Sequence, residues 1–497
     1  MAGSATHTPT LRERLLSETV DTADLGELQG LGSRATSFYE RSLAQRTFAP
    51  LSAGGIRSSV FVLVQTALGG GVLTIAYMLK ISGPFMGVFL LLAGMLVAFV
   101  SMDVLMKSAV LLHRYTFGSL VSYAFGPRSG IFLDMMLFLY GNGSLLMYFI
   151  FLGDFIPSIF LYFTGQTGTP VADRTTPEYA ELRAHCLVAM FLLVFPVSLF
   201  RDLSAFKVLS PYFLLAILYT EILVLVTCVS SFRTPDGWDW WQHLREVNIH
   251  GPSLEANFSD FPGICRAFSI SVMAYCCHLN VVPVAKELTN PQDRRIEKIC
   301  LRVAYAQLII YLFMSVAGFL AFGDGTPQNL LEAYSPENRY ALVGRCLMAF
   351  TVLVALATNT NPTVRAGLCL LEVQVESIRD HDYGISPADL QKSPLQPRPT
   401  NGEADKEPSR RRMVRYLLTL VCLFADMVIA MNVRDVANVV GLLGATMGNV
   451  MMMVIPLLLL YLLRNDLYDR KWKTIGIAVI LFLAGILAVA SIFVPKS

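Results

Sequence analysis

Residues 65–77 read QTALGGGVLTIAY, with three consecutive glycines, Gly69, Gly70 and Gly71, inside a long apolar run. Each glycine in a helix interior costs about 1 kcal/mol relative to alanine. Irregular backbone at membrane depth is tolerated only where protein covers it or where it lines a cavity, and there its N–H and C=O groups can hold a ligand. Small residues also allow close helix packing, but three in a row exceed that need. The segment predicts a half-helix, a break and a second half-helix.

A second interruption lies at residues 274–288, which read AYCCHLNVVPVAKEL. His278, Asn280 and Pro283 fall within an otherwise apolar run. Proline lacks a backbone N–H and clashes with the preceding turn, so we expect the helix to unwind or kink just before Pro283. Interrupted helices in corresponding places of two sets of five spans indicate inverted repeats, with a substrate site between the two breaks.

The rest of the chain has the composition of a membrane protein. Of its 497 residues, 54% are hydrophobic and 15% charged, and the mean hydropathy is +0.54, which is too apolar for a soluble protein. Runs long enough to cross a bilayer predict an all-α polytopic protein with about eleven transmembrane helices. They are residues 57–80, 84–112, 130–163, 184–200, 208–231, 261–284, 301–322, 340–372, 413–431, 436–463 and 475–494. The third and eighth are long enough to tilt or to extend past the membrane.

Charge placement predicts the orientation and the flanking segments. Loops on the side of the N-terminus carry more Lys and Arg, and loops on the other side lean acidic, so the positive-inside rule places the N-terminus in the cytoplasm. The net charge of +2 gives no reason to expect a nucleic-acid partner. Residues 1–53 and 380–409 are rich in Pro, Ser, Gly and charge. We expect both to be disordered and cytoplasmic, around a transmembrane domain at residues 54–497.

Five motifs in order resemble the amino acid/auxin permease family, which includes the sodium-coupled neutral and the vacuolar amino acid transporters. They are LGGGVLTIAY (68–77), CHLNVVPVAKEL (277–288), GFLAFG (318–323), NTNPTVR (359–365) and VVGLLGATMGNVMMMVIPLLLLYL (439–462). The resemblance covers residues 57–494 and implies eleven helices in a five-plus-five inverted repeat with helices 1 and 6 broken. It also implies a secondary carrier that moves amino acids across a plasma membrane or a vacuolar/lysosomal-type membrane by alternating access.

The substrate of such a carrier is expected between the two breaks. Its carboxylate would lie at the N-terminus of the second half of span one, where unpaired N–H groups and the positive end of the helix dipole converge. Its ammonium group would be held by carbonyl oxygens at either break. The candidate binding residues are Gln65, Thr66, Gly69, Gly70, Gly71, Tyr275, Cys276, His278 and Asn280.

The coupling ion stays open between sodium and a proton. In sodium-coupled members of the family a hydroxyl of the eighth helix joins backbone carbonyls of the first helix around the ion, which makes Thr358 and Thr360 candidates. Gln65 stands where those members usually have asparagine, which weakens the sodium assignment. For a proton, His278 has a side chain that titrates near neutral pH, although it could instead only fix the kink. Glu221, a carboxylate at membrane depth, is a further candidate.

Two other functions are alternatives to a carrier. An amino-acid-sensing receptor on the same fold could signal through residues 1–53 or 380–409. An integral membrane enzyme would need a nucleophile with its base or a metal cluster, and the sequence has no HExxH, GxSxG, Walker or CxxC pattern. We therefore expect no enzyme activity, no metal and no cofactor besides the coupling ion. The sequence gives no oligomeric state.

Overall fold

The computed structural model describes residues 55–69, 71–169, 173–200, 210–234, 237–239, 242–243, 246, 260–383, 409–464, 466–468 and 470–493. The described part of the chain does not include residues 1–53, residues 384–408 or Gly70. The predictions made for these residues therefore stay predictions. Residues 380–383 continue a helix, and Ser409 begins the next one.

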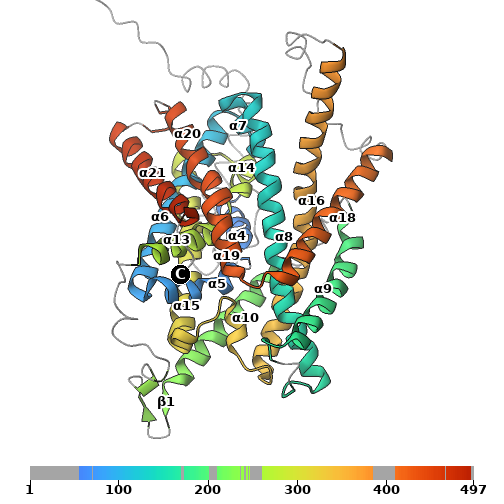
Figure 1. Cartoon of the computed structure of the whole chain (residues 1–497). Coiled ribbons are helices and arrows are strands. Elements are labelled where there is room, and N and C mark those ends of the chain that lie inside the picture. The colour runs from blue at the N-terminus through green and yellow to red at the C-terminus, as the bar shows by residue number, and fades with distance from the viewer. Residues whose placement is uncertain are drawn as a thin grey trace, which may run out of the picture.

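The described residues form a helical bundle (Figure 1). Its first half consists of α4 (Ile56–Ala67), α5 (Gly71–Ser82), α6 (Pro84–Leu111), α7 (Phe117–Phe125), α8 (Pro127–Thr164), α9 (Pro177–Ser198) and α10 (Ser210–Ser231). Its second half consists of α13 (Phe261–Tyr275), α14 (His278–Glu287), α15 (Asp293–Phe322), α16 (Arg339–Tyr383), α18 (Ser409–Asn432), α19 (Val436–Leu443), α20 (Ile455–Leu462) and α21 (Lys471–Phe493). Short pieces complete the chain: the antiparallel pair β1 (Arg233–Thr234) and β2 (Gly237–Trp238), the 3-10 turns η4 (Gly323–Gly325) and η5 (Leu330–Ala333), and the π-helical segments η6 (Gly444–Gly448) and η7 (Val450–Val454).

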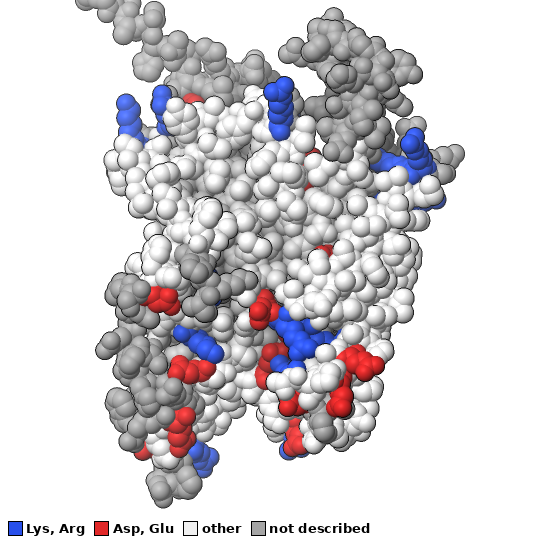
Figure 2. All heavy atoms as spheres, viewed as in Figure 1, with Lys and Arg blue, Asp and Glu red and all other residues white. Residues whose placement is uncertain are grey.

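In the described residues, ten helical spans are long and apolar enough to cross a membrane, and the bent pair α4–α5 makes eleven. This confirms the expected number. Figure 2 shows the corresponding surface, in which Lys, Arg, Asp and Glu gather toward the two ends and a mostly uncharged belt lies between them. The short helix α7 was not expected, because nine residues are too few for a search based on spans of about 20 residues.

Both predicted breaks are present. The axis bends by 63° between α4 and α5. The second break is at Cys276 and Cys277, where Cys276 is extended with φ −75° and ψ 98°. The expectation of a kink just before Pro283 is wrong, since α14 continues through this residue. Pro283 removes only the backbone hydrogen bond to the Leu279 carbonyl, four residues earlier, and the short helix tolerates that loss.

The two longest helices also agree with the sequence analysis. α8 has 38 residues and α16 has 45, so at 1.5 Å per residue they measure about 57 and 68 Å, well beyond a hydrocarbon core of about 30 Å. They pack against each other, and a side chain at Gly141 would collide with Thr363. This close approach fixes α8 and α16 as one wall beside the two breaks.

Candidate functional site

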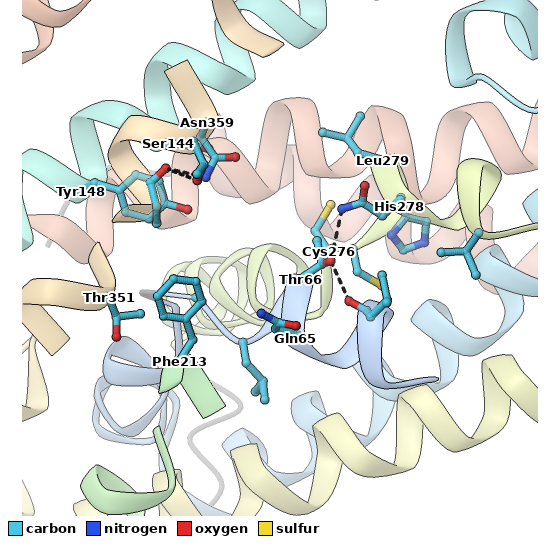
Figure 3. A pocket seen from close by; sticks show the side chains of 18 of the residues that line it. Gln65, Thr66, Ser144, Tyr148, Phe213, Cys276, His278, Leu279, Thr351 and Asn359 are labelled. Carbon is cyan, nitrogen blue, oxygen red and sulfur yellow. Dashed lines mark hydrogen bonds between the residues drawn. The ribbon is translucent and has the colours of Figure 1, made fainter. Parts of the chain in front are cut away.

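A cavity of about 910 Å³ lies where the two breaks meet the wall formed by α8 and α16. Figure 3 shows polar and aromatic side chains from both broken spans, α8, α10 and α16 around this space. The lining residues are Phe61, Val62, Gln65, Thr66, Leu68 and Gly69 of the first span, Tyr140, Ser144 and Tyr148 of α8, Phe213 of α10, Cys276, Cys277, His278, Leu279, Asn280, Pro283, Val284 and Glu287 of the second broken span, and Met348, Thr351, Val352, Ala355, Thr358 and Asn359 of α16.

The cavity opens toward one end of the bundle. Its lining continues along α4 and α14 to Val62, Pro283 and Glu287, all of which are exposed. These helices lead to the end of the bundle that carries α7 in Figure 1. Beyond the breaks, by contrast, Val72 and Ala274 are buried, with 1% and 2% exposure. The second halves of the two spans therefore differ, since α14 borders the opening and α5 is packed.

Hydrogen bonds tie down the opposite end. Lys80 Nζ on α5 donates to the Thr326 carbonyl at 3.2 Å. Asn329 Nδ2 donates to Asp154 Oδ2 on α8 at 3.2 Å. Thr326 and Asn329 belong to the loop that joins η4 to η5. This loop is therefore bound to both α5 and α8. These bonds hold the loop against the bundle at the end opposite to the cavity opening.

Six of the nine candidate substrate residues line the cavity: Gln65, Thr66, Gly69, Cys276, His278 and Asn280. Gly70 lies outside the described residues. Gly71 and Tyr275 are not part of the described lining. Gly71 lies against α13, where a Cβ would make ordinary contact with Ala274 Cα at 3.6 Å. Tyr275 is fully buried on the side of α13 that faces Gly94 of α6.

His278 is held by a residue that the sequence did not single out. Its Nε2 lies 2.7 Å from Ser101 Oγ on α6, and the imidazole is fully buried. The Ser101 hydroxyl also lies 3.1 Å from the Ala98 carbonyl, and the direction of the bond between Ser101 and His278 depends on the tautomer of the imidazole. Within the described residues, Nδ1 has no hydrogen-bond partner.

The candidate sodium ligands are spread over different environments. Thr358 lines the cavity, but its hydroxyl donates to the Val354 carbonyl at 2.9 Å and the Ala355 carbonyl at 3.1 Å. Thr360 is fully buried, and its hydroxyl donates to Leu356 at 2.7 Å. Neither Thr360 nor Glu221 belongs to the described cavity lining. The structure therefore brings Gln65, His278 and Thr358 to one cavity and leaves the other two candidates apart from it.

Sequence reasoning missed the α8 side of the site. Tyr140, Ser144 and Tyr148 lie at intervals of four residues, which puts them on one face of a helix, and this spacing could have been recognised. Phe213 and Met348 carried no such signal, because each is an apolar residue in an apolar helix.

Residues 52–494 match the family described as transmembrane amino acid transporter protein. The chain belongs to this family. It is thus a multi-pass membrane protein from a family of transporters, which agrees with the expected carrier and not with an enzyme.

Individual relatives have similar descriptions. A putative amino acid transporter AAT1 of Toxoplasma gondii is 28% identical over 66% of this chain, a match that spans 42% of the relative. Sodium-coupled neutral amino acid transporter 7 of Xenopus laevis is 24% identical over 89% of both chains. Vacuolar amino acid transporter 6 of Saccharomyces cerevisiae is 24% identical over 81% of this chain and 88% of the relative.

A solved structure supports the fold. The crystal structure of MhsT in complex with L-phenylalanine superposes with a TM-score of 0.55 at 11% identity, covering 89% of this chain and 99% of the other. This similarity agrees with the five-plus-five inverted repeat expected from the sequence.

Proposed function

We propose that this chain is a secondary transporter that carries amino acids by alternating access, and that the structure represents its cytoplasm-facing state. The observation that carries the proposal is the cavity at the two breaks, which opens along α4 and α14 and is closed beyond them. The end with the opening is mostly basic in Figure 2, whereas acidic residues are concentrated at the other end. By the positive-inside rule the open end faces the cytoplasm, together with the N-terminus.

The substrate is an amino acid bound with its backbone groups at the breaks. Gly69 lies in the cavity lining, and a Cβ there would meet no atom within 4 Å. A carboxylate can therefore approach the backbone before α5, whose N-terminal N–H groups favour an anion. The aromatic residues Tyr140, Tyr148 and Phe213 line the cavity and would contact the substrate side chain.

A proton is the coupling ion that the local hydrogen bonds favour. A sodium site needs several oxygen ligands around the ion, and of the two candidate threonines only Thr358 belongs to the described cavity lining. His278 lies at the second break, and its Nδ1 has no hydrogen-bond partner among the described residues, which leaves this nitrogen for a transported proton. Plasma membranes and vacuolar or lysosomal-type membranes both sustain proton gradients, and either is a suitable location for this carrier.

Uptake by reconstituted protein separates the carrier from a sensing receptor on the same fold. Proteoliposomes that contain the full chain should accumulate labelled amino acid to a level that exceeds binding to the protein and that is released when the vesicles are lysed. A receptor would show saturable binding at one molecule or less per protein, with no accumulation, and this result would contradict the proposal.

A further inference from the structure

A second cavity, of about 290 Å³, lies between α6, α15 and α21. Its volume is close to the lower limit of pockets that bind small molecules, about 300 Å³. It is found where α6 ends and where α15 and α21 begin, and its described lining shares no residue with that of the transport cavity. The lining residues are Phe99, Val100, Asp103 and Lys107 of α6, Glu297 of α15, Tyr468, and Trp472, Lys473, Gly476, Ile477 and Ile480 of α21.

This cavity belongs to the outer surface of the bundle. On α6 the exposed apolar side chains recur every three or four residues, at Phe85, Phe89, Leu92 and Leu96. On α15 they recur every four residues, at Leu301, Tyr305, Ile309 and Phe313. Phe99 and Asp103 continue the first series and Glu297 precedes the second by four residues, so they lie on the same helix faces. These faces contact the bilayer, and the cavity is therefore reached from the lipid.

Asp103 has one carboxylate oxygen that lacks a hydrogen-bond donor. The residue is only 4% exposed. Its Oδ2 accepts hydrogen bonds from Lys107 Nζ and from the Tyr468 hydroxyl, both at 2.6 Å. Its Oδ1 is buried and has no partner among the described residues. A buried acceptor without a donor costs free energy, so a ligand that brings an N–H or O–H group into this cavity would be favoured.

The remaining charges of the cavity have opposite signs. Glu297 and Lys473 are both exposed, and within the described residues neither forms an ion pair. Trp472 lies beside Lys473 and is 64% exposed. Tryptophan is enriched at the level of the lipid headgroups. The cavity thus presents a buried acceptor, a second carboxylate and an ammonium group at headgroup level.

We propose that this cavity binds the headgroup of phosphatidylethanolamine. The primary ammonium donates to Asp103 Oδ1 and is attracted by Glu297, and Lys473 attracts the phosphate. The acyl chains follow the exposed apolar faces of α6 and α15. Choline carries the same charge but has no N–H group, so phosphatidylcholine cannot satisfy Oδ1. The site goes beyond the proposed transport function and does not depend on it.

The fluorescence of Trp472 provides a direct measurement. Purified full-length protein is reconstituted in phosphatidylcholine with increasing phosphatidylethanolamine whose acyl chains carry bromine, a quencher of tryptophan, and then in the reverse mixture. The other tryptophans are at positions 238, 240 and 241, and a Trp472→Phe protein gives their contribution. Phosphatidylethanolamine should quench Trp472 at a mole fraction about tenfold lower than phosphatidylcholine, as expected for one hydrogen bond to a charged group. N-methylated ethanolamine lipids, which have fewer N–H groups, should fall between the two.

Variants show whether the carboxylates cause this preference. Glu297→Gln should reduce it. The double variant Asp103→Leu, Lys107→Met removes the acceptor together with both buried charges, which keeps the fold, and it should abolish the preference. Glu337→Gln removes an exposed carboxylate outside the cavity and should leave the preference unchanged.

Three results would overturn the proposal. The first is equal quenching of wild-type Trp472 by the two lipids. The second is a preference that persists in both Glu297→Gln and the double variant. The third is stronger quenching by brominated phosphatidylglycerol, which would show an anion site. Since no transport is measured, a wild-type protein that fails to accumulate amino acid would count only against the proposed function.

Discussion

The side-chain amide of Asn280 donates a hydrogen bond of 3.2 Å to the Thr66 hydroxyl. This bond joins α14, the second half of one broken span, to α4, the first half of the other. The Thr66 hydroxyl in turn donates a hydrogen bond to the Val62 carbonyl at 2.8 Å. The contact lies in the cavity lining, on the side that is open. Residues 214 positions apart thereby link α14 to α4 in this state.

Breaking this bond should change the balance between transport states. Asn280→Ala and Thr66→Val each remove one partner, and a neutral hydrogen bond contributes about 0.5–1.5 kcal/mol. A double-mutant cycle on the KM for uptake should show that the double variant is little worse than either single variant. Fully additive effects would mean that the two side chains act separately, for example by each binding the substrate.

Gly69 and Gly71 should respond differently to the same substitution. Valine at Gly69 enters open space, so the fold should be kept while the side chain obstructs the approach of a carboxylate and uptake falls strongly. Valine at Gly71 presses on Ala274 at the end of α13, so the unfolding temperature should fall as well. Thermal unfolding and uptake of the two variants distinguish these outcomes. Unchanged uptake by Gly69→Val would remove the glycine from the binding site.

His278→Gln tests the proton relay against a purely structural histidine. Glutamine can still donate to Ser101 Oγ, but it does not titrate near neutral pH. The variant should exchange internal for external amino acid at a rate close to that of the wild type, while its uptake no longer responds to an imposed pH gradient. Ser101→Ala should retain that response in weakened form, since it removes only the partner of Nε2. A pH response that survives in His278→Gln would leave the histidine with a structural role.

The buried ion pair between Asp103 and Lys107 makes a prediction about stability. Lys107 Nζ lies 2.6 Å from Asp103 Oδ2, which also accepts a hydrogen bond from the Tyr468 hydroxyl at 2.6 Å. Asp103→Asn leaves the lysine charge buried without its counter-ion, which should cost about 3–5 kcal/mol. The double change to Asp103→Leu and Lys107→Met removes both charges and should recover most of the loss in thermal unfolding. Equal unfolding temperatures for Asp103→Asn and wild type would contradict this.

The sequence predicted the helical spans and the two breaks because both are local properties. The length of an apolar run shows whether a helix can cross the bilayer, and consecutive glycines or a proline indicate irregular backbone. The same reasoning placed the second break too close to Pro283, since a proline marks a weak point and not the site of bending. The π-helical segments η6 and η7 had no sequence signal. η6 packs against α13, where any side chain at Gly444 would collide with the Ser269 backbone.

The sequence predicted those site residues that are polar and flank the breaks. It did not predict the residues whose role depends on the direction in which a helical side chain points. Tyr275 is adjacent to the break, yet its ring points to Gly94 and Tyr311, because each residue of a helix turns the side-chain direction by about 100°. Tyr311 itself lies in an unbroken apolar span. Its hydroxyl donates to backbone carbonyls 37 and 244 positions away, a contact that no local pattern encodes.

The central claim, a proton-coupled amino acid carrier, is tested most directly by uptake into proteoliposomes under separately imposed gradients. The purified full chain is reconstituted, and labelled amino acid uptake is followed with a pH gradient alone, a sodium gradient alone, or neither. The account predicts concentrative uptake with the pH gradient, including when choline replaces sodium, and no added uptake from sodium. Uptake that requires sodium and ignores the pH gradient would contradict it, and would return attention to Thr358 and Gln65 as ion ligands.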